Sequence, residues 1–443
     1  MTTIDNFDIA NDLKVEFFLP DSSENAFIIG ISTLGSSRVL SGGNTFIIDQ
    51  SLLGGENVLD GGGTNSFTWQ NLSCTVARAN LENGGQIQDQ LYFQPQPAGA
   101  RLTLQTYDYD PSQNTSFRPG VPVRIKLVKG EIDKIIWSGI VDSIGGTYTI
   151  DGKNLLQVIA FDSMKQLLNT RIASFDSSNP DGYVSPLEQL EIIANEFGSS
   201  ISDLSKVAAG RIPSETLTQV IPSNLILEAI QVGLGLFWID AKTQEFVFVP
   251  RPDPETLPDF PVGANYFKID ESLLGGIDVL GSGQETIYTI GNNHEALNHL
   301  CMTNISTLAS SDEVFNSLRV ELASDPDTFV LQENLDSISL YGTYAKDVSL
   351  NTTSVQELDR WASSVFNQSP TDLVQNIETL TLDRQGNLTE AAFLLPGTLI
   401  GVDFTQDTLE ILDYYTMVKV SHFIDSDTWL TTLDLWKEAK NEL

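Results

Sequence analysis

A fifteen-residue segment occurs twice in this chain of 443 residues, at 46–60 (FIIDQSLLGGENVLD) and at 267–281 (FKIDESLLGGIDVLG). Ten of the fifteen positions are identical, and the copies begin 221 residues apart. A solenoid needs at least three repeats, so two copies favour a duplicated domain. The alternative is a linker element that recurs without a common fold context. We expect the copies to occupy equivalent places in two related domains.

Each copy of this motif has the pattern of a short strand, a polar turn and a leucine pair closed by glycines. Phe and Ile at alternate positions point to one face of a strand, and the paired glycines permit a sharp reversal of the chain. The leucine pairs are either plugs at the end of a barrel or contacts to a neighbouring barrel. We predict the contact, because a repeated exposed leucine pair suits equivalent interfaces: Leu52, Leu53, Leu273 and Leu274.

The first 170 residues contain short runs rich in β-branched and aromatic residues, separated by clusters of Gly, Pro, Asn and Asp. This spacing is typical of sandwiches and barrels, and it predicts a first β-barrel domain over residues 1–170. The expected strands are 14–18, 26–32, 74–79, 101–105, 121–127, 133–141, 148–150 and 155–161.

Residues 171–262 have the pattern of a small α+β domain. Ser185 and Glu188 form a capping box before an apolar stripe at helical spacing, and Gly198 ends that helix. We expect a second helix to begin at Ser223 and a hairpin to follow, with strands at 236–240 and 246–249. Five prolines between residues 250 and 261 then predict a rigid linker at the domain boundary.

Strands resume after this linker, which predicts a second β-barrel domain over 263–443. Ser354 and Glu357 begin one inserted helix at 354–368, whose apolar stripe includes Trp361. The fold class is therefore mainly β with an α+β insertion: two related β-barrel domains plus a small α+β domain. The four closing strands are expected at 377–382, 399–404, 416–423 and 429–435.

Charge limits the partners of the chain. It has 24 Lys and Arg against 59 Asp and Glu, a net charge of −35, which repels nucleic acid and anionic membranes. The acid surplus provides solubility, or it forms a wall past which DNA slides without sticking. Between 101 and 171, basic residues outnumber acids, which favours an interface with an acidic neighbour. The candidate interface residues there are Arg118, Arg124 and Lys126.

Catalytic, cofactor-binding and metal-binding motifs are not found. The two cysteines, Cys74 and Cys301, cannot make a four-thiolate site, and they fit buried thiols in a protein made in a reducing cytoplasm. The histidines do not form an HExxH pair, and no GxxxxGK(S/T) or GxSxG motif occurs. The chain holds no apolar run long enough to span a membrane. We therefore predict a protein that is not an enzyme, with no cofactor and no membrane insertion.

Six tryptophans could form a sugar-binding set, but five of them lie inside apolar runs, so core packing is expected. The six are Trp69, Trp137, Trp238, Trp361, Trp429 and Trp436.

Four segments, taken in order, resemble the minor tail proteins of long-tailed bacteriophages, the family of tail hubs and secretion-system spike bases. They are 99–111 (GARLTLQTYDYDP), 117–125 (FRPGVPVRI), 136–141 (IWSGIV) and 156–162 (LQVIAFD). The C-terminal half resembles the closing part of the same family at 339–342 (SLYG), 420–424 (VSHFI) and 429–435 (WLTTLDL). The glycine-rich stretch 41–63 departs from the family pattern.

This resemblance implies a homotrimer in which two barrels per chain make a ring of six. Such a ring adapts a sixfold tail tube to a threefold tip and surrounds the DNA exit channel. The implied partners are the distal tail or tail-tube ring, a tip, spike or fibre protein, the tape measure protein, and genomic DNA in transit only. The implied location is the tail tip or baseplate of the virion. The alternative function is a tail-tip adhesin that binds carbohydrate.

Overall fold

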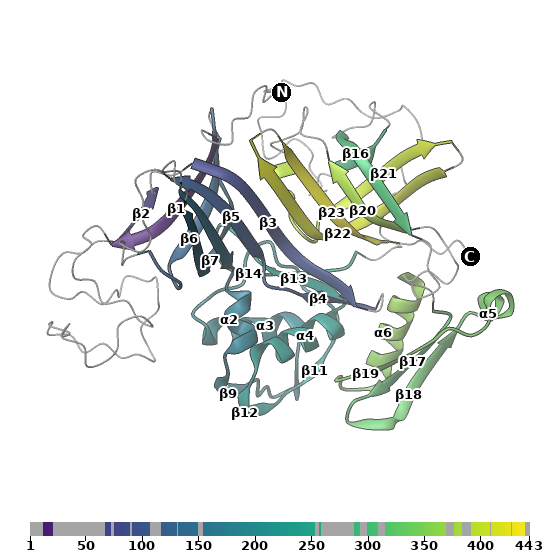
Figure 1. Ribbon diagram of the computed structural model, residues 1–443. Helices are drawn as coiled ribbons and strands as arrows, with labels where there is room; N and C mark the ends of the chain where they lie inside the picture. The colour runs from purple at the N-terminus through teal and green to yellow at the C-terminus, as the bar shows by residue number, and fades with distance from the viewer. Residues whose placement is uncertain are drawn as a thin grey trace, which may run out of the picture.

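The computed structural model shows a mainly β protein, as the strand pattern predicts (Figure 1). The described residues are 12–20, 67–71, 75–88, 91–106, 117–130, 132–148, 154–252, 257, 288–292, 299–308, 315–368, 376–382, 391–407, 409–426 and 428–438. Two β units lie side by side, and the helices with their small sheets lie below them in this view.

The first β unit is a curved sheet around its own core. Its strands follow the order β2 (Phe67–Asn71), β1 (Leu13–Pro20), β6 (Pro122–Lys129), β7 (Ile132–Tyr148), β8 (Asn154–Phe161), β5 (Gly99–Thr106) and β3 (Thr75–Gln88), and β4 (Tyr92–Pro95) adds to β3. Alternate residues of β6, namely Val123, Ile125 and Leu127, are buried in this core. The sheet begins with β2 and ends with β3, which follow one another in the chain, so the sheet curls back toward its first strand.

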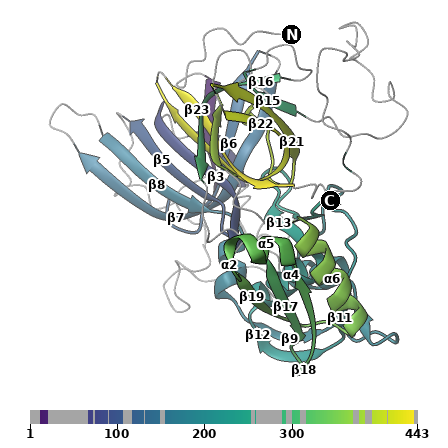
Figure 2. The same ribbon diagram turned by 90° about the vertical axis from the view of Figure 1, so that its right-hand side faces the viewer.

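The second β unit is a closed barrel of six strands (Figure 2). Hydrogen bonds between the last two strands in the chain complete the circle, and a separate core fills it. The order around the barrel is β22 (Leu409–Asp425), β21 (Leu399–Gln406), β15 (Tyr288–Gly291), β16 (His299–Leu308), β20 (Asn376–Leu382) and β23 (Trp429–Lys437).

The two β units repeat one topology, which confirms the expectation of two related barrels. Strands β2, β3, β5, β6, β7 and β8 correspond to β15, β16, β20, β21, β22 and β23, with β1 as an extra strand between β2 and β6. In both units a hairpin with a two-residue loop leads into the longest strand, from β6 to β7 and from β21 to β22. The first loop residue is left-handed each time, with φ of 59° at Gly130 and 54° at Asp407, as tight hairpins require.

A Pro-Gly turn recurs before this hairpin in each unit. Gly120 (φ 94°) and Gly397 (φ 79°) lie 277 residues apart, and their N–H groups donate to the carbonyls of Val141 and Met417 at 2.7 and 2.8 Å. The N–H groups of Val141 and Met417 donate back to the residue after each glycine. The Pro-Gly turn at 119–120 is thus one copy of a duplicated element.

Both copies of the fifteen-residue motif lie outside the described residues, and so do the four leucines within them. The first strand after each copy begins seven residues beyond it, at Phe67 and at Tyr288. These two strands, β2 and β15, correspond in the two barrels. The equivalence of the motif copies themselves stays a prediction, which the strands that follow them support.

Three long strands differ from their expected lengths. β7 runs without a break through residues 132–148, where two shorter strands were expected, and β3 and β22 also extend beyond the predicted runs. Gly145 and Gly146 suggest a break in the sequence, but both lie within the ladder to β8. The strands are long because each pairs with one neighbour along its first part and with another along its second part.

The α+β part begins with α2 (Met164–Asn169), and its next helix, α3 (Pro186–Glu196), has the predicted capping box. The N–H of Glu188 donates to Ser185 Oγ at 3.2 Å, and the N–H of Ser185 donates to Glu188 Oε2 at 2.7 Å. Helix α4 (Pro222–Gly233) begins one residue before the predicted Ser223, because proline suits the first turn. The predicted hairpin is β13 (Gly235–Ile239) with β14 (Phe246–Pro250). Small ladders join β9 (Ile172–Asp176) to β12 (Thr216–Val220), and β10 (Tyr183–Val184) to β11 (Ile212–Pro213).

Replacing Ser185 with alanine should lower the free energy of unfolding by about 1 kcal/mol, because the N–H of Glu188 loses its acceptor. Urea denaturation of the variant and the parent measures this. Ser223→Ala is the matched control, since Ser223 is the second residue of α4, and no side-chain cap bond forms at the start of that helix. Equal losses in the two variants would contradict the prediction.

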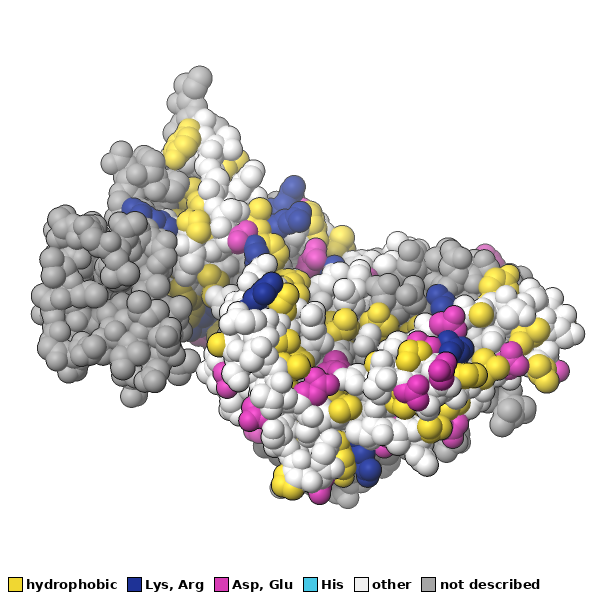
Figure 3. All heavy atoms as spheres, turned by 90° about the horizontal axis from the view of Figure 1, so that it is seen from below, with side chains coloured by type: hydrophobic (Ala, Val, Ile, Leu, Met, Phe, Trp, Pro, Cys, Tyr) yellow, Lys and Arg dark blue, Asp and Glu magenta, His cyan; other side chains and the backbone are white. Residues whose placement is uncertain are grey.

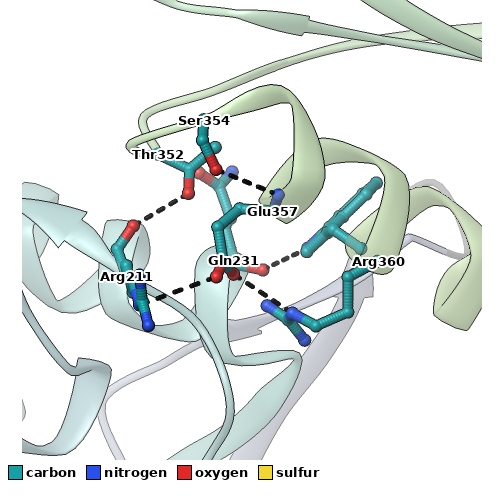
Figure 4. A network of polar contacts seen from close by, with 7 residues as sticks. Arg211, Gln231, Thr352, Ser354, Glu357 and Arg360 are labelled. Atoms are coloured by element: carbon teal, nitrogen blue, oxygen red, sulfur yellow. Dashed lines mark hydrogen bonds and ion pairs between the residues drawn. The ribbon is translucent and has the colours of Figure 1, made fainter.

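An insertion in the second barrel packs on this α+β part. It consists of β17 (Ser317–Leu322), β18 (Asp325–Glu333), α5 (Leu335–Tyr341), β19 (Ala345–Leu350) and α6 (Val355–Gln368). Trp361 is fully buried, and its indole N–H donates to the carbonyl of Gln231 on α4 at 2.6 Å (Figure 4). Thr352 donates to the carbonyl of Arg211 at 2.8 Å in the same network. One core therefore joins residues on both sides of position 262, while the division at 170 and 262 stays a prediction.

The far end of this α+β part presents hydrophobic and acidic side chains interspersed on one face (Figure 3). The exposed large hydrophobic residues of the insertion are Phe329, Leu331, Leu335, Leu340, Tyr341 and Val355. Within the part of the chain that the structure describes, no helix is long and apolar enough to cross a membrane.

Candidate functional site

The two barrels are joined by a continuous ladder, and this junction is the candidate assembly site. The second half of β22, residues 419–425, pairs antiparallel with residues 78–84 of β3. Ile424 is fully buried and belongs to the core of the first barrel, as does Trp429 on β23. The junction is therefore a shared core as well as a ladder of hydrogen bonds.

The close approach of β3 and β22 depends on a glycine. Gly84 has a φ of 112°, and a Cβ built on it would lie 2.2 Å from the carbonyl oxygen of Val418. No other residue fits this space without moving the backbone. A Gly-Gly pair inside a strand is the sequence signal for such a place, and the sequence analysis missed it.

Polar contacts reinforce the junction on both sides. Lys419 pairs with Glu82 across the ladder at 2.8 Å. The β13–β14 hairpin reaches the first barrel, where Gln244 Nε2 donates to Ser138 Oγ at 2.8 Å and Ser138 donates to the carbonyl of Ala241. The α+β part is thus tied to the barrels at the point where they meet.

His422 is buried at the centre of the junction strand, opposite Leu81 of β3. Its Nδ1 lies 3.0 Å from Thr431 Oγ1, and the indole N–H of Trp429 donates to it at 3.4 Å. Because Nδ1 accepts from the indole, the imidazole must be neutral with its proton on Nε2. Burial lowers the pKa of His422 to about 4. This is the state of a structural histidine in a core.

A second buried polar group lies where the chain leaves the α+β part. Arg251, directly after β14, pairs with Glu438 at the end of β23 through a 3.0 Å contact, and their side chains are 1% and 0% exposed. Thr416 Oγ1 donates to Glu438 at 2.7 Å, and the guanidinium lies 3.8 Å from the centre of the Trp436 ring. Sequence analysis missed this pair, because the two residues are 187 positions apart.

The predicted interface residues of the first barrel are found in two places. Arg124 Nε donates to Glu16 at 2.6 Å and its guanidinium stacks on Trp69, while Lys126 pairs with Asp133 at 2.5 Å. Both line a cleft of about 490 Å³ between the two barrels and the β13–β14 loop. Arg118 lies in the Pro-Gly turn instead, half-buried, beside the second half of β7.

The tryptophans are core residues with one exception. Trp137, Trp238, Trp361, Trp429 and Trp436 are each at most 5% exposed, whereas Trp69 is 37% exposed against Arg124. Core packing was expected for the five tryptophans that lie inside apolar runs. Trp69 is one of these five and differs from the expectation, whereas Trp436, which lies outside such a run, is buried as well. Among the described residues, no group of three or more His, Cys, Asp and Glu side chains could hold a metal ion.

Solved structures similar to this chain include tail proteins and a component of a secretion system. The tail protein of Neisseria meningitidis MC58 aligns with 85% of this chain and 94% of its own, with a TM-score of 0.53 and 11% identity. The 43 kDa tail protein of prophage MuSo2 from Shewanella oneidensis aligns over 84% and 94%, with a TM-score of 0.48 and 11% identity. The E. coli c3393 protein, a type VI secretion component described as similar to the T4 tail proteins gp27 and gp5, aligns over 83% and 76%, with a TM-score of 0.44 and 11% identity.

No protein-family model matches the sequence, and no curated protein matches it either. The likeness is therefore one of fold, carried by the Neisseria structure over nearly its whole length. The chain has the fold of this tail protein, so the expected resemblance to tail proteins is confirmed at the level of the fold.

Proposed function

We propose that this chain is a structural hub protein of a bacteriophage tail and is not an enzyme. The observation that carries the proposal is the pair of equivalent barrels joined side by side through non-equivalent strands. Such a joint is heterologous, so the same kind of contact can repeat from one chain to the next and close into a ring. Three chains with two barrels each give six similar units around one axis.

A ring of this kind matches two symmetries at once. Its six barrels present a nearly sixfold face to a distal tail or tail-tube ring, while its three α+β parts present a threefold face to a tip, spike or fibre protein. The adaptation is geometric and makes or breaks no bond. A ring with this role would lie at the tail tip or baseplate of the virion, with the tape measure protein as a further partner.

The central opening of the ring would be the path of genomic DNA. A net charge of −35 suits a wall that DNA passes in transit, because Lys or Arg contacts to phosphate would retain it. The adhesin alternative lacks support from the tryptophans, since five of the six are buried in cores.

The expected assembly is a homotrimer, because the resemblance to tail hubs implies three chains, and a heterologous joint lets their six barrels close into a ring. Light scattering on the purified full chain should give three times the 48.6 kDa of one chain. A reconstruction of the tail tip should show three copies on the axis. A dimer, or six copies around the axis, would contradict the proposal.

A further inference from the structure

The ladder that joins the barrels uses one strand from each of them, and each barrel also holds the counterpart of the other strand. β3 of the first barrel corresponds to β16 of the second, and β22 of the second corresponds to β7 of the first. A β-bulge marks the correspondence of β7 and β22, since both shift register against their next strand, at Val141/Ser143 and at Met417/Lys419. β3 and β16 share a bulge as well, at Val76/Arg78 and at Met302/Asn304.

The second half of β7 is exposed where its counterpart is buried. Tyr148 occupies the place of Ile424, which the first barrel covers completely, yet Tyr148 is 56% exposed. Residues 145–147 beside it are exposed too. An exposed edge of this length is a pairing site that proteins normally cover.

Strand β16 of the second barrel is likewise less buried than its counterpart β3. Met302 and Ile305 pack against the core of the second barrel but are only partly buried, whereas their counterparts Val76 and Ala79 on β3 are 4% and 0% exposed. Ala79 is covered because β22 pairs with this part of β3 and Ile424 lies opposite it. Each chain therefore has two strands that could form a second junction of this kind. They are β7, the counterpart of β22, on the first barrel and β16, the counterpart of β3, on the second barrel.

We propose that the second half of β7 forms an antiparallel ladder with β16 of a second copy of this chain, reproducing the joint between β3 and β22. The observed ladder pairs Ile424 with Ala79 and Phe423 with Asn80. Transferred to the counterparts, Tyr148 lies opposite Ile305 of the next copy and Thr147 lies opposite Ser306. This inference rests on the proposed trimer and names the strands that build it.

Charge at the rim of this joint favours the same pairing. In the joint within the chain, Leu395 lines the cleft together with Lys126 and Asp133. Counting from the Pro-Gly turns, the counterpart of Leu395 is Arg118, and the counterparts of Lys126 and Asp133 are Asp403 and Glu410. A cleft between copies would thus bring a cation on the first barrel to two acids on the second.

Cysteine cross-linking tests the joint and its register. Thr147→Cys and Ser306→Cys are combined in a full chain in which Cys74 and Cys301 are serine. Opposed cysteines on antiparallel strands lie within disulfide reach, so mild oxidation should give a covalent series that ends at the trimer on a non-reducing gel. The control combines Thr147→Cys with Thr307→Cys, whose side chain points to the other face of the sheet, and about tenfold less product is expected.

Light scattering on the same samples separates the possible failures. A trimer that does not cross-link, or that cross-links equally in the control, overturns this joint and leaves the proposed hub standing. A chain that stays monomeric at all concentrations overturns both. In a second variant, Arg118→Glu should raise the trimer dissociation constant about tenfold while Arg118→Lys retains the parent value, because a charge facing Asp403 and Glu410 is reversed only in the first. Equal dissociation constants for the two variants overturn the charge arrangement.

Discussion

Replacing Arg251 with methionine should lower the free energy of unfolding by about 3–5 kcal/mol, the usual loss when one partner of a buried ion pair is removed. The two side chains are 1% and 0% exposed, so water cannot solvate the carboxylate that remains. Burial raises the pKa of Glu438, while Arg251 and the Thr416 hydroxyl lower it. Without the guanidinium, Glu438 must stay charged in a dry site or take up a proton. Urea denaturation followed by circular dichroism measures the loss.

A double variant shows whether charge or packing is responsible. Arg251→Met combined with Glu438→Leu removes both charges and leaves apolar side chains of similar size, so it should be clearly more stable than Arg251→Met alone. Arg251→Lys keeps the charge but loses the planar contact with Trp436 and one of the two donors to the carboxylate, so its stability should lie between. An Arg251→Met variant with the same free energy of unfolding as the parent would contradict the prediction.

The Arg251–Glu438 pair also shows why sequence reasoning reached some features and not others. The capping box at Ser185 is visible because its atoms lie three residues apart and their geometry is local. The stripe around Trp361 predicts a helix for the same reason. The acceptor of the Trp361 indole, the carbonyl of Gln231, is 130 positions away, so the packing of α6 on α4 has no local signal.

The junction between the barrels was hidden for a related reason. In the sequence, the glycines at 145 and 146 have the pattern of a turn, whereas in the structure they are part of a single strand of 17 residues. The correspondence of β7 with β22 could have been found by aligning residues 117–133 with 394–410, where the Pro-Gly turns coincide without a gap. The repeat at 46 and 267 is more obvious in the sequence, and the expected interface leucines lie within it. These candidate residues lie outside the described part of the chain.

His422 should make the junction sensitive to acid. The pKa of the imidazole is about 4 in the folded protein, because burial disfavours the charged form, against 6.5 when exposed. As pH falls below 6.5, His422 binds a proton in the unfolded chain but stays neutral in the folded chain. The free energy of unfolding therefore decreases between pH 6.5 and pH 4. The expected loss from this group is about 3 kcal/mol, since one pKa unit corresponds to about 1.4 kcal/mol.

A buried carboxyl opposes this trend over the same range, so the test needs a difference between proteins. Burial raises the pKa of Asp162 to about 8, and this group gains stability as pH falls. Replacing His422 with glutamine removes the imidazole and leaves Asp162 in place. The difference in unfolding free energy between parent and His422→Gln, measured by urea denaturation from pH 7 to pH 4, should change by about 3 kcal/mol in favour of the variant as pH falls. A difference that stays constant with pH would show that the imidazole is not neutral and buried, and the account of the junction core would fail.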